Sequence, residues 1–169
     1  IGQAKNLWDT PALLLQKFPA PDFKATTKLT FSPFKKGERA GLMVMGQDYA
    51  TLTLDETENG LVLNYSICMN ATAGNAEIIQ TSVPMKQNSV YLSVEVKQTK
   101  SLNKEKILQP TATCIFSYSA DGKLFTEIEK PFIAWEGKWI GAKVGIFCQR
   151  PKALNDSGYA DFDWFRIDK

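Results

Sequence analysis

Apolar and polar residues alternate along much of this chain, and the alternation predicts a protein built of β-strands. Residues 23–31 read FKATTKLTF, with apolar positions recurring at every second residue. Because strand side chains point alternately to the two faces of a sheet, this segment is expected to be a strand with one buried and one wet face. Residues 90–97 (VYLSVEVK) show the same period, and no stretch of ten or more residues keeps a helical one.

Turn signals divide the rest of the chain into further short strands. Asn59-Gly60 is the strongest hairpin signal, residues 119–123 (SADGK) form a second turn, and the lysine-containing residues 99–110 predict a polar loop. The other runs that we expect to be strands are 39–45, 49–54, 61–69, 76–82, 111–119, 124–132 and 143–149. Strands at this spacing, about ten to eleven in all, favour an all-β jelly-roll sandwich of two antiparallel sheets.

The final segment, residues 158–167 (GYADFDWFRI), has bulky side chains at both alternating sets of positions. One set is Asp161, Asp163, Phe165 and Ile167, and the other is Ala160, Phe162, Trp164 and Arg166. Since both sets include aromatic or apolar side chains, we expect this strand to lie inside a sheet, with other parts of the protein packed on both of its faces.

Length and charge narrow the class of protein. A chain of 169 residues fits one domain, here residues 1–169 with 1–12 as an irregular lead-in. A net charge of +2 is too small to indicate a nucleic-acid partner. No apolar run reaches the roughly 20 residues of a membrane span, and the N-terminus lacks the pattern of a signal peptide. Because the chain starts at Ile1 rather than at Met, we expect a processed chain or part of a longer one.

The residue types exclude several kinds of chemistry within this chain. There is no histidine, which removes Ser-His-Asp and Cys-His catalysis and the commonest metal ligand. Each cysteine lies in an apolar, strand-like run, and there is no CxxC motif, so we predict buried free thiols rather than a disulfide framework. These cysteines are Cys68, Cys114 and Cys148. The sequence indicates no cofactor.

Acidic residues offer two hypotheses. Asp161 and Asp163 on one strand face would lie roughly 6.6–7 Å apart at Cα, which overlaps the separation of about 6.5–9.5 Å between the carboxyls of inverting glycosidases. Carboxyls on one face point the same way, however, and do not straddle a bond, so hydrogen bonding to loops or an ion pair is favoured over catalysis.

Several acids could also be calcium ligands, but they lack the spacing of a calcium loop, and a solvated acidic turn is favoured over a metal site. These acids are Asp48, Asp55, Glu56 and Glu58.

Aromatic residues with polar neighbours could bind sugar, since the apolar faces of sugar rings stack on Trp and Tyr while hydroxyls need polar partners. The residues proposed for such a site are Gln16, Arg39, Tyr49, Trp135, Trp139 and Asp161. Core packing is the alternative for every aromatic residue in a β-protein, and it is favoured for Tyr65 and Trp164.

Four segments of the chain, taken together and in order, resemble a known family. They are GERAGLMVMGQDYATLTL (37–54), FSYSADGKLFTEI (116–128), KVGIFCQRP (143–151) and GYADFDWFRI (158–167). The chain resembles the C-terminal β-sandwich domain of glycoside hydrolase family 43, whose members are β-xylosidases and α-L-arabinofuranosidases. The AGL segment followed by Tyr, the Ser-x-Asp-Gly turn and the ADFD(W/Y)F ending are specific to that family in combination, and any one alone is weak. The sandwich-glycosidase pattern Glu-x-Asp-x-x-Glu is absent, because Tyr159 stands two residues before Asp161 and Arg166 stands three residues after Asp163, where glutamates would be required.

The resemblance implies a concanavalin A-like jelly roll and a partner, a five-bladed β-propeller that precedes the sandwich and holds the catalytic carboxylates. It implies xylo- or arabino-oligosaccharide as the substrate contact and a secreted or periplasmic location. It also implies that a loop of the sandwich can help to wall the active site, for which residues 70–75 and 150–157 are the candidates.

Four hypotheses follow. The first is a non-catalytic accessory domain of a xylan- or arabinan-degrading enzyme. The alternative is an independent carbohydrate-binding module. Less favoured are a self-sufficient sandwich glycosidase and an interaction domain unrelated to sugar.

Overall fold

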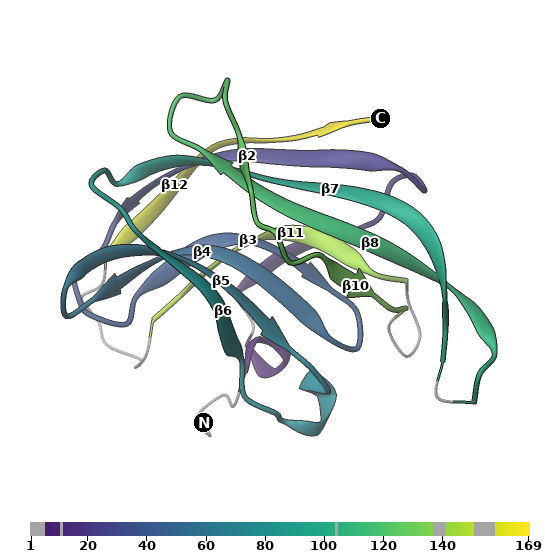
Figure 1. Cartoon of the computed structure of the whole chain (residues 1–169). Helices are drawn as coiled ribbons and strands as arrows, with labels where there is room; N and C mark the ends of the chain where they lie inside the picture. The colour runs from purple at the N-terminus through teal and green to yellow at the C-terminus, as the bar shows by residue number, and fades with distance from the viewer. Residues whose placement is uncertain (1–5, 11, 104, 137–140, 151–157) are drawn as a thin grey trace.

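Two antiparallel sheets packed face to face form the protein, in a computed structural model that describes residues 6–10, 12–103, 105–136, 141–150 and 158–169 (Figure 1). The first sheet has the strand order β1 (Leu13–Lys17), β11 (Lys143–Gln149), β3 (Arg39–Met45), β4 (Tyr49–Thr57), β5 (Gly60–Cys68) and β6 (Ile78–Pro84). The second has the order β10 (Phe132–Ala134), β8 (Leu108–Ser119), β7 (Ser89–Leu102), β2 (Phe23–Ser32) and β12 (Tyr159–Asp168), with β9 (Thr126–Glu127) also paired to β8. We call them sheet A and sheet B. The predicted all-β sandwich is confirmed.

The core lies between the sheets and is filled by the apolar positions of the alternating strands. Leu42 and Leu52 of sheet A and Leu29 and Leu92 of sheet B are fully buried there. Such side chains each contribute about 1.5–3 kcal/mol on burial. Alternation therefore brings the two sheets together, as the pattern in residues 23–31 and 90–97 predicts.

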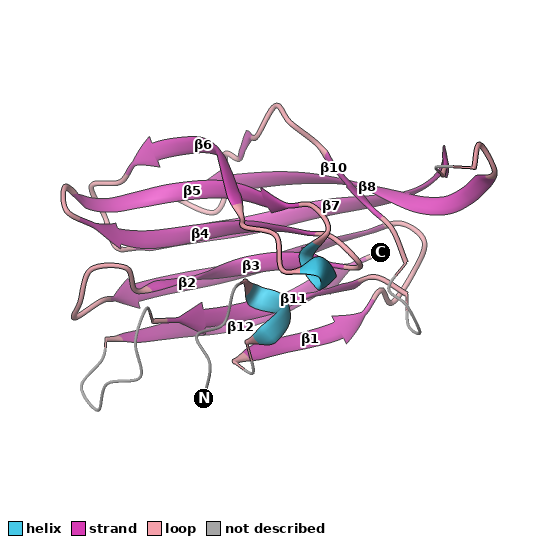
Figure 2. Ribbon diagram, turned by 90° about the horizontal axis from the view of Figure 1, so that it is seen from below, coloured by secondary structure: helices cyan, strands magenta, loops and turns pink. Residues whose placement is uncertain are grey.

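Sheet A is also covered on its outer face. Two short 3-10 helices, η1 (Leu7–Asp9) and η2 (Ala71–Ala73), lie against it (Figure 2). They enclose a second apolar cluster, whose buried members are Leu7, Met43, Met45, Tyr49, Cys68, Ala71 and Phe147. The amide of Asn6 donates hydrogen bonds to the carbonyls of Ala71 and Asn75, at 2.9 and 2.8 Å, which tie the two helices together. Within the described residues no helix is long and apolar enough to cross a membrane.

The prediction that the final strand lies inside a sheet, with each face holding one alternating set, is wrong. β12 is the edge strand of sheet B and pairs only with β2. A β-bulge between Phe162 and Trp164 inserts one extra residue and reverses the faces after it. Phe162 and Phe165 therefore pack on the core, whereas Trp164 contacts Tyr91 of β7. This reversal explains why large apolar side chains occur in both alternating sets of residues 158–167.

Three further predictions are wrong. Residues 99–110 form a hairpin instead of a loop, because β7 runs to Leu102 and pairs with β8 from Leu108 onward. Residues 124–132 do not form one strand, since Asp121 accepts the backbone N–H groups of Lys123 and Leu124 and holds a wide turn before β9. Cys148 is exposed rather than buried, because the pairing of β11 with β1 ends at Phe147 and leaves Cys148 beyond that edge strand; Cys68 and Cys114 are buried free thiols as predicted.

A carboxylate holds the start of β12 to the turn between β2 and β3. Glu38, only 4% exposed, accepts the backbone N–H groups of Phe34, Lys35 and Gly158 at 2.7–3.2 Å. Burial acts to raise the pKa of Glu38, but these three hydrogen bonds hold it below its ordinary value of 4.5.

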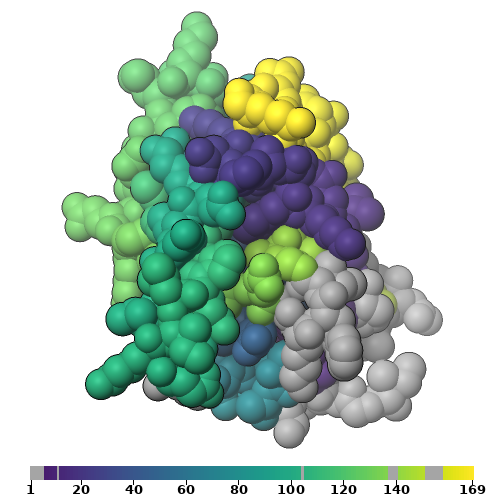
Figure 3. Space-filling model, turned by 90° about the vertical axis from the view of Figure 1, so that its right-hand side faces the viewer, coloured from purple at the N-terminus to yellow at the C-terminus, as the bar shows by residue number. Residues whose placement is uncertain are grey.

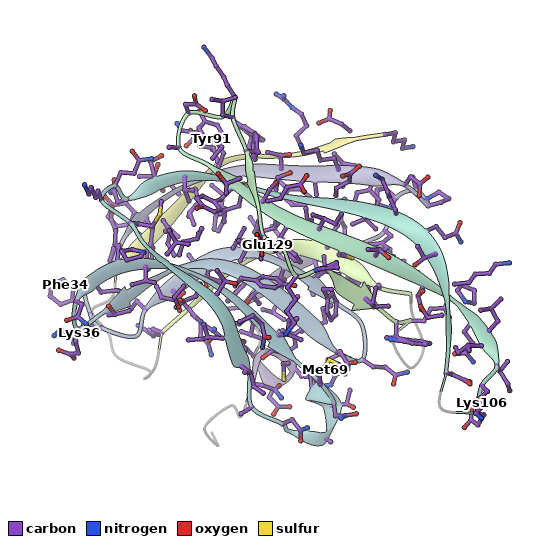
Figure 4. All side chains as sticks on the ribbon, in the orientation of Figure 1. Phe34, Lys36, Met69, Tyr91, Lys106 and Glu129 are labelled. Atoms are coloured by element: carbon purple, nitrogen blue, oxygen red, sulfur yellow. The ribbon has the colours of Figure 1, made fainter. Side chains whose placement is uncertain are left out.

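We expect this carboxylate to make stability depend on acid. A folded-state pKa below the unfolded value gives stability that is present above the unfolded pKa and lost as the pH falls through the folded one. Glu38→Gln should cost about 1–3 kcal/mol at neutral pH, because three backbone N–H groups lose a charged acceptor. Urea unfolding of both proteins from about pH 6 to about pH 3 should show a smaller acid loss in the variant. Glu129→Gln, at an exposed position, is the control (Figure 4); an equal acid loss in Glu38→Gln and wild type would contradict the assignment.

Candidate functional site

A polar network spans the outer face of sheet A. The register pairs Arg39 with Asp55 and Met45 with Tyr49, so Arg39 and Tyr49 stand at opposite ends of β3 and β4. At a rise of about 3.3 Å per residue, six residues separate them by roughly 20 Å along the strands. Both nevertheless bond Glu77, with Arg39 Nη2 at 3.1 Å and Tyr49 Oη at 2.9 Å from Glu77 Oε2. The two side chains therefore lie along the sheet and meet near its middle.

Small residues form the floor beneath this network. Thr51, Thr53 and Ser66 are buried although they are polar and face outward, with at most 1% exposed. Gly41 is on the same face, and the close approach of β4 requires glycine there, since a Cβ would lie 2.2 Å from the carbonyl oxygen of Leu52. Larger side chains at these positions would push Arg39 and its partners off the sheet.

The charged groups of the network, Arg39 and Glu77, neutralise each other. The side chains of Arg39 and Glu77 are only 19% and 13% exposed, and Arg39 Nε also donates to Gln149 Oε1 at 2.9 Å. Burial acts to lower the pKa of Arg39, but the hydrogen bond and charge of Glu77 raise it above its ordinary value. Burial raises the pKa of Tyr49, and the charge of Glu77 adds to that rise. Both groups therefore keep their protons, and the network holds residue 77 down on the sheet.

A second set of polar contacts continues from this network toward β6. Asn64 donates to Asp55 Oδ2 at 2.7 Å and accepts from Ser82. Burial raises the pKa of Asp55, while hydrogen bonds from Thr53 and Asn64 and the charge of Arg39 act to lower it. The sequence held no signal for Glu77, because its partner Arg39 is 38 positions away and only the fold brings them together.

Of the residues predicted to bind sugar, the structure brings together only Arg39 and Tyr49. Gln16 is exposed on β1 and pairs with Val144 of the core, so it lies on the opposite face of sheet A. Asp161 is exposed on the outer face of sheet B, opposite Thr30. Trp135 is half-buried just after β10, and Trp139 lies outside the described residues. Those of the six that the structure describes do not form one surface.

The acidic residues have separate partners as well. Asp163 forms an ion pair with Lys28 at 2.6 Å on the outer face of sheet B, beside Asp161 on the same strand. Asp48 accepts the backbone N–H of Asn70, and Glu58 pairs with Lys36. In the part of the chain that the structure describes, no three His, Cys, Asp or Glu side chains gather as metal ligands would.

Two features were not predicted from the sequence. On the outer face of sheet B, Trp164 lies between Tyr91, 6.2 Å away between ring centroids, and the guanidinium of Arg166 at 4.9 Å. Only the bulge in β12 puts Trp164 on this face. The other feature is a cleft of about 420 Å³ at one end of the sandwich, bordered by residues 17–21 and 110–112.

The whole chain can now be compared with known proteins. Residues 1–168 match the family described as the β-xylosidase C-terminal concanavalin A-like domain. The chain belongs to this family. The resemblance noted in residues 37–54 and 158–167 is thereby confirmed, and the domain is one that forms the C-terminal part of family 43 β-xylosidases.

Individual relatives are longer than this chain. A β-xylosidase of Formosa agariphila is 43% identical over 54 residues, which are 32% of this chain and 9% of that protein. A family 43 protein of Bacillus licheniformis has a TM-score of 0.70 at 20% identity, covering 97% of this chain and 30% of its own. A bifunctional family 43 protein of Bacteroides eggerthii has a TM-score of 0.73 at 23% identity, with coverages of 92% and 18%. The two structures show the shared fold, and this chain spans under a third of each relative's length.

We expect the network on sheet A to be structural and to depend on Glu77. Glu77→Gln removes the charge that neutralises a largely buried Arg39 and should lower the free energy of unfolding by about 1–3 kcal/mol. Glu58→Gln is the matched control, because Glu58 pairs with Lys36 at the surface, where their side chains are 77% and 55% exposed. The loss in free energy of unfolding should therefore stay below about 1 kcal/mol. Urea denaturation measures both, and equal effects of the two variants would count against the network.

Proposed function

We propose that this chain is a non-catalytic accessory domain of a family 43 glycoside hydrolase that acts on xylan- or arabinan-type polysaccharide. Membership of the β-xylosidase C-terminal family over residues 1–168 supports the proposal most directly. The domain packs on a catalytic β-propeller of the same polypeptide and helps to shape its substrate pocket. The propeller, not this chain, supplies the acid and base.

The local geometry agrees with a supporting role. Asp161 and Asp163 stand side by side on one edge strand, and Asp163 is paired with Lys28, so they do not flank a bond to be broken. Of the loops considered for the active site, residues 70–75 are held against sheet A by Asn6 and Asp48. Most of residues 150–157 lie outside the described residues.

One observation favours the alternative, an independent carbohydrate-binding module. The Trp164, Tyr91 and Arg166 group on the outer face of sheet B presents aromatic and cationic surface near the exposed Asp161. Sugar rings stack on such aromatic faces. These rings also pack on each other, and the Tyr91 ring packs on Gly122, where a Cβ would lie 2.9 Å from it, so packing explains them without a ligand.

The experiment separates the accessory domain from the alternatives. Titration of the chain with xylo- and arabino-oligosaccharides should give no saturable heat at concentrations that detect a Kd of about 1 mM, which corresponds to about −4.1 kcal/mol. Nitrophenyl β-xyloside and α-L-arabinofuranoside should not be hydrolysed by the chain but should be hydrolysed by the longer polypeptide that contains it. Deleting residues 1–169 from that polypeptide should lower its melting temperature.

Other results would select another function. Saturable binding that is lost in Trp164→Ala, and kept in Leu124→Ala, would establish the binding module. Hydrolysis by the chain that is lost in Asp161→Asn or Asp163→Asn would establish a glycosidase. A longer polypeptide with no glycosidase activity would overturn the proposal altogether.

A further inference from the structure

Sheet B extends beyond sheet A at one end of the sandwich. The β7–β8 hairpin is flanked by β2 only as far as Val96 and by β10 only over Ala112–Cys114. Four further pairs, from Thr99 with Thr111 to Leu102 with Leu108, have no strand on either side among the residues that the structure describes. They project roughly 13 Å, and Figure 1 shows this hairpin extending past the rest of the sheet. Lys106 marks its tip in Figure 4.

The underside of this hairpin continues the core-facing surface of sheet B. Val96 and Cys114 are a fully buried pair, and the next pairs on the same face are Gln98 with Ala112, Lys100 with Pro110, and Leu102 with Leu108. Leu102 and Leu108 are 62% and 58% exposed, and Ile107 in the turn is 57% exposed. A two-stranded ribbon is at most marginally stable alone. An apolar face on such a ribbon is typical of a surface that another body covers.

The opposite face of the ribbon is polar and has its own hydrogen bonds. The hydroxyl of Thr111 lies 3.1 Å from that of Thr99 and 2.9 Å from that of Ser101, and Thr99 also bonds Thr113 at 3.3 Å. These hydroxyls form a ladder on the outer side. The hairpin is thus amphipathic, with the apolar side turned toward the space beyond the end of sheet A.

The cleft lies at the base of this hairpin. The apolar groups around it come from the hairpin, from the β1–β2 connection and from the start of β11: Phe18, Pro19, Pro21, Pro110, Ala112 and Ala142. Gln98, Lys17 and Glu136 add polar groups at its edges. Figure 3 looks onto this side of the molecule, with the green hairpin beside the purple beginning of the chain. Cleft and hairpin underside form one continuous surface.

This surface suits a folded protein better than a sugar. Sugar sites need a free aromatic face and several convergent hydrogen-bonding groups. Phe18 is the aromatic residue of the described lining, and its ring packs edge-on against Phe23 at 5.1 Å. Proline rings and leucine side chains supply apolar contact area without donors. Lys17 borders the cleft and Lys100 lies on the hairpin underside itself, so the complementary surface is an apolar patch that also carries carboxylates.

We propose that the underside of the β7–β8 hairpin, with the cleft at its base, is the surface on which this domain docks to the catalytic domain of its own polypeptide. The inference rests on the proposed function and adds which face is used. The occupant is a domain of the same chain because the solved relatives are more than three times as long as the part matched here. Covalent linkage gives such a domain a high effective concentration at the hairpin.

Hydrogen exchange on the longer polypeptide and on the 169-residue chain tests the proposal. Amides of residues 99–110 should exchange at least about tenfold more slowly in the longer polypeptide, equivalent to about 1.4 kcal/mol of added protection. The double variant Leu102→Lys, Leu108→Lys should abolish this difference and increase the radius of gyration of the longer polypeptide. Its melting temperature as the 169-residue chain should stay that of wild type, because both leucines are exposed there.

Leu124→Lys is the matched control, since Leu124 is 81% exposed and lies beyond the far end of β8. It should change neither exchange nor the radius of gyration. A compact longer polypeptide with unprotected residues 99–110 would overturn this docking surface and leave the accessory role intact. An extended polypeptide in which no part of residues 1–169 gains protection would overturn both proposals.

Two further outcomes would assign the surface to another occupant. Dimerisation of the 169-residue chain, lost in the double variant, would show that a second copy covers the hairpin. Slower exchange of residues 17–21 on adding xylo-oligosaccharide would make the cleft a ligand site. Either result would overturn the docking proposal.

Discussion

Burial of both faces of sheet A is the constraint on which the rest of the structure depends. Its inner face packs on sheet B through the alternating apolar residues, and this part of the fold follows directly from the hydrophobic effect. Its outer face is covered partly by the apolar cluster beneath η1 and η2 and partly by polar contacts, in which Arg39 and Tyr49 bond Glu77. Gly41, Thr51 and Thr53 are small, buried residues of the same face.

That covering decides which surfaces remain for function. A sheet face lined with Arg, Tyr and small polar residues is a plausible sugar-binding surface from the sequence alone, and the sequence prediction used Arg39 and Tyr49 in that way. In the fold their polar groups bond Glu77, Gln149 and the backbone N–H of Leu7. A ligand on this face would have to displace partners that neutralise a largely buried cation, at a cost of several kcal/mol. The end of the sandwich and the outer face of sheet B are not closed in this way.

The sequence predicts the fold better than the site because the two depend on signals of different range. Alternation in residues 23–31 and the Asn59-Gly60 turn are local, and both predict the observed strands and hairpin. The reversal of faces in β12 comes from one bulged residue, and no local pattern distinguishes a bulge from a regular strand. The lysines in residues 99–110 indicated a loop, but a solvent-exposed ribbon tolerates lysine as well as a loop does.

Contacts between residues that are far apart in the sequence account for the other features that the sequence did not predict. Glu77 could not be singled out among the acidic residues, because its role exists only once β3, β4 and the segment before β6 are assembled. Likewise, the apolar period of residues 90–96 is interrupted by Gln98 and Lys100 before Leu102 resumes it, although the strand continues. Their exposure is set by where sheet A ends, which depends on the lengths of β1, β3 and β11 rather than on β7 itself.

The limited size of the hairpin surface is consistent with docking inside one polypeptide. Interfaces between domains of a chain bury about 600–1,500 Å² and are more polar than those of obligate complexes. Three exposed apolar residues at the hairpin tip and a cleft of about 420 Å³ could not hold two free proteins together at low concentration. A linker removes most of the entropic cost of association, so the same contacts suffice when the partner is covalently attached. The modest apolar area, with lysines around it, is therefore what docking within a chain requires.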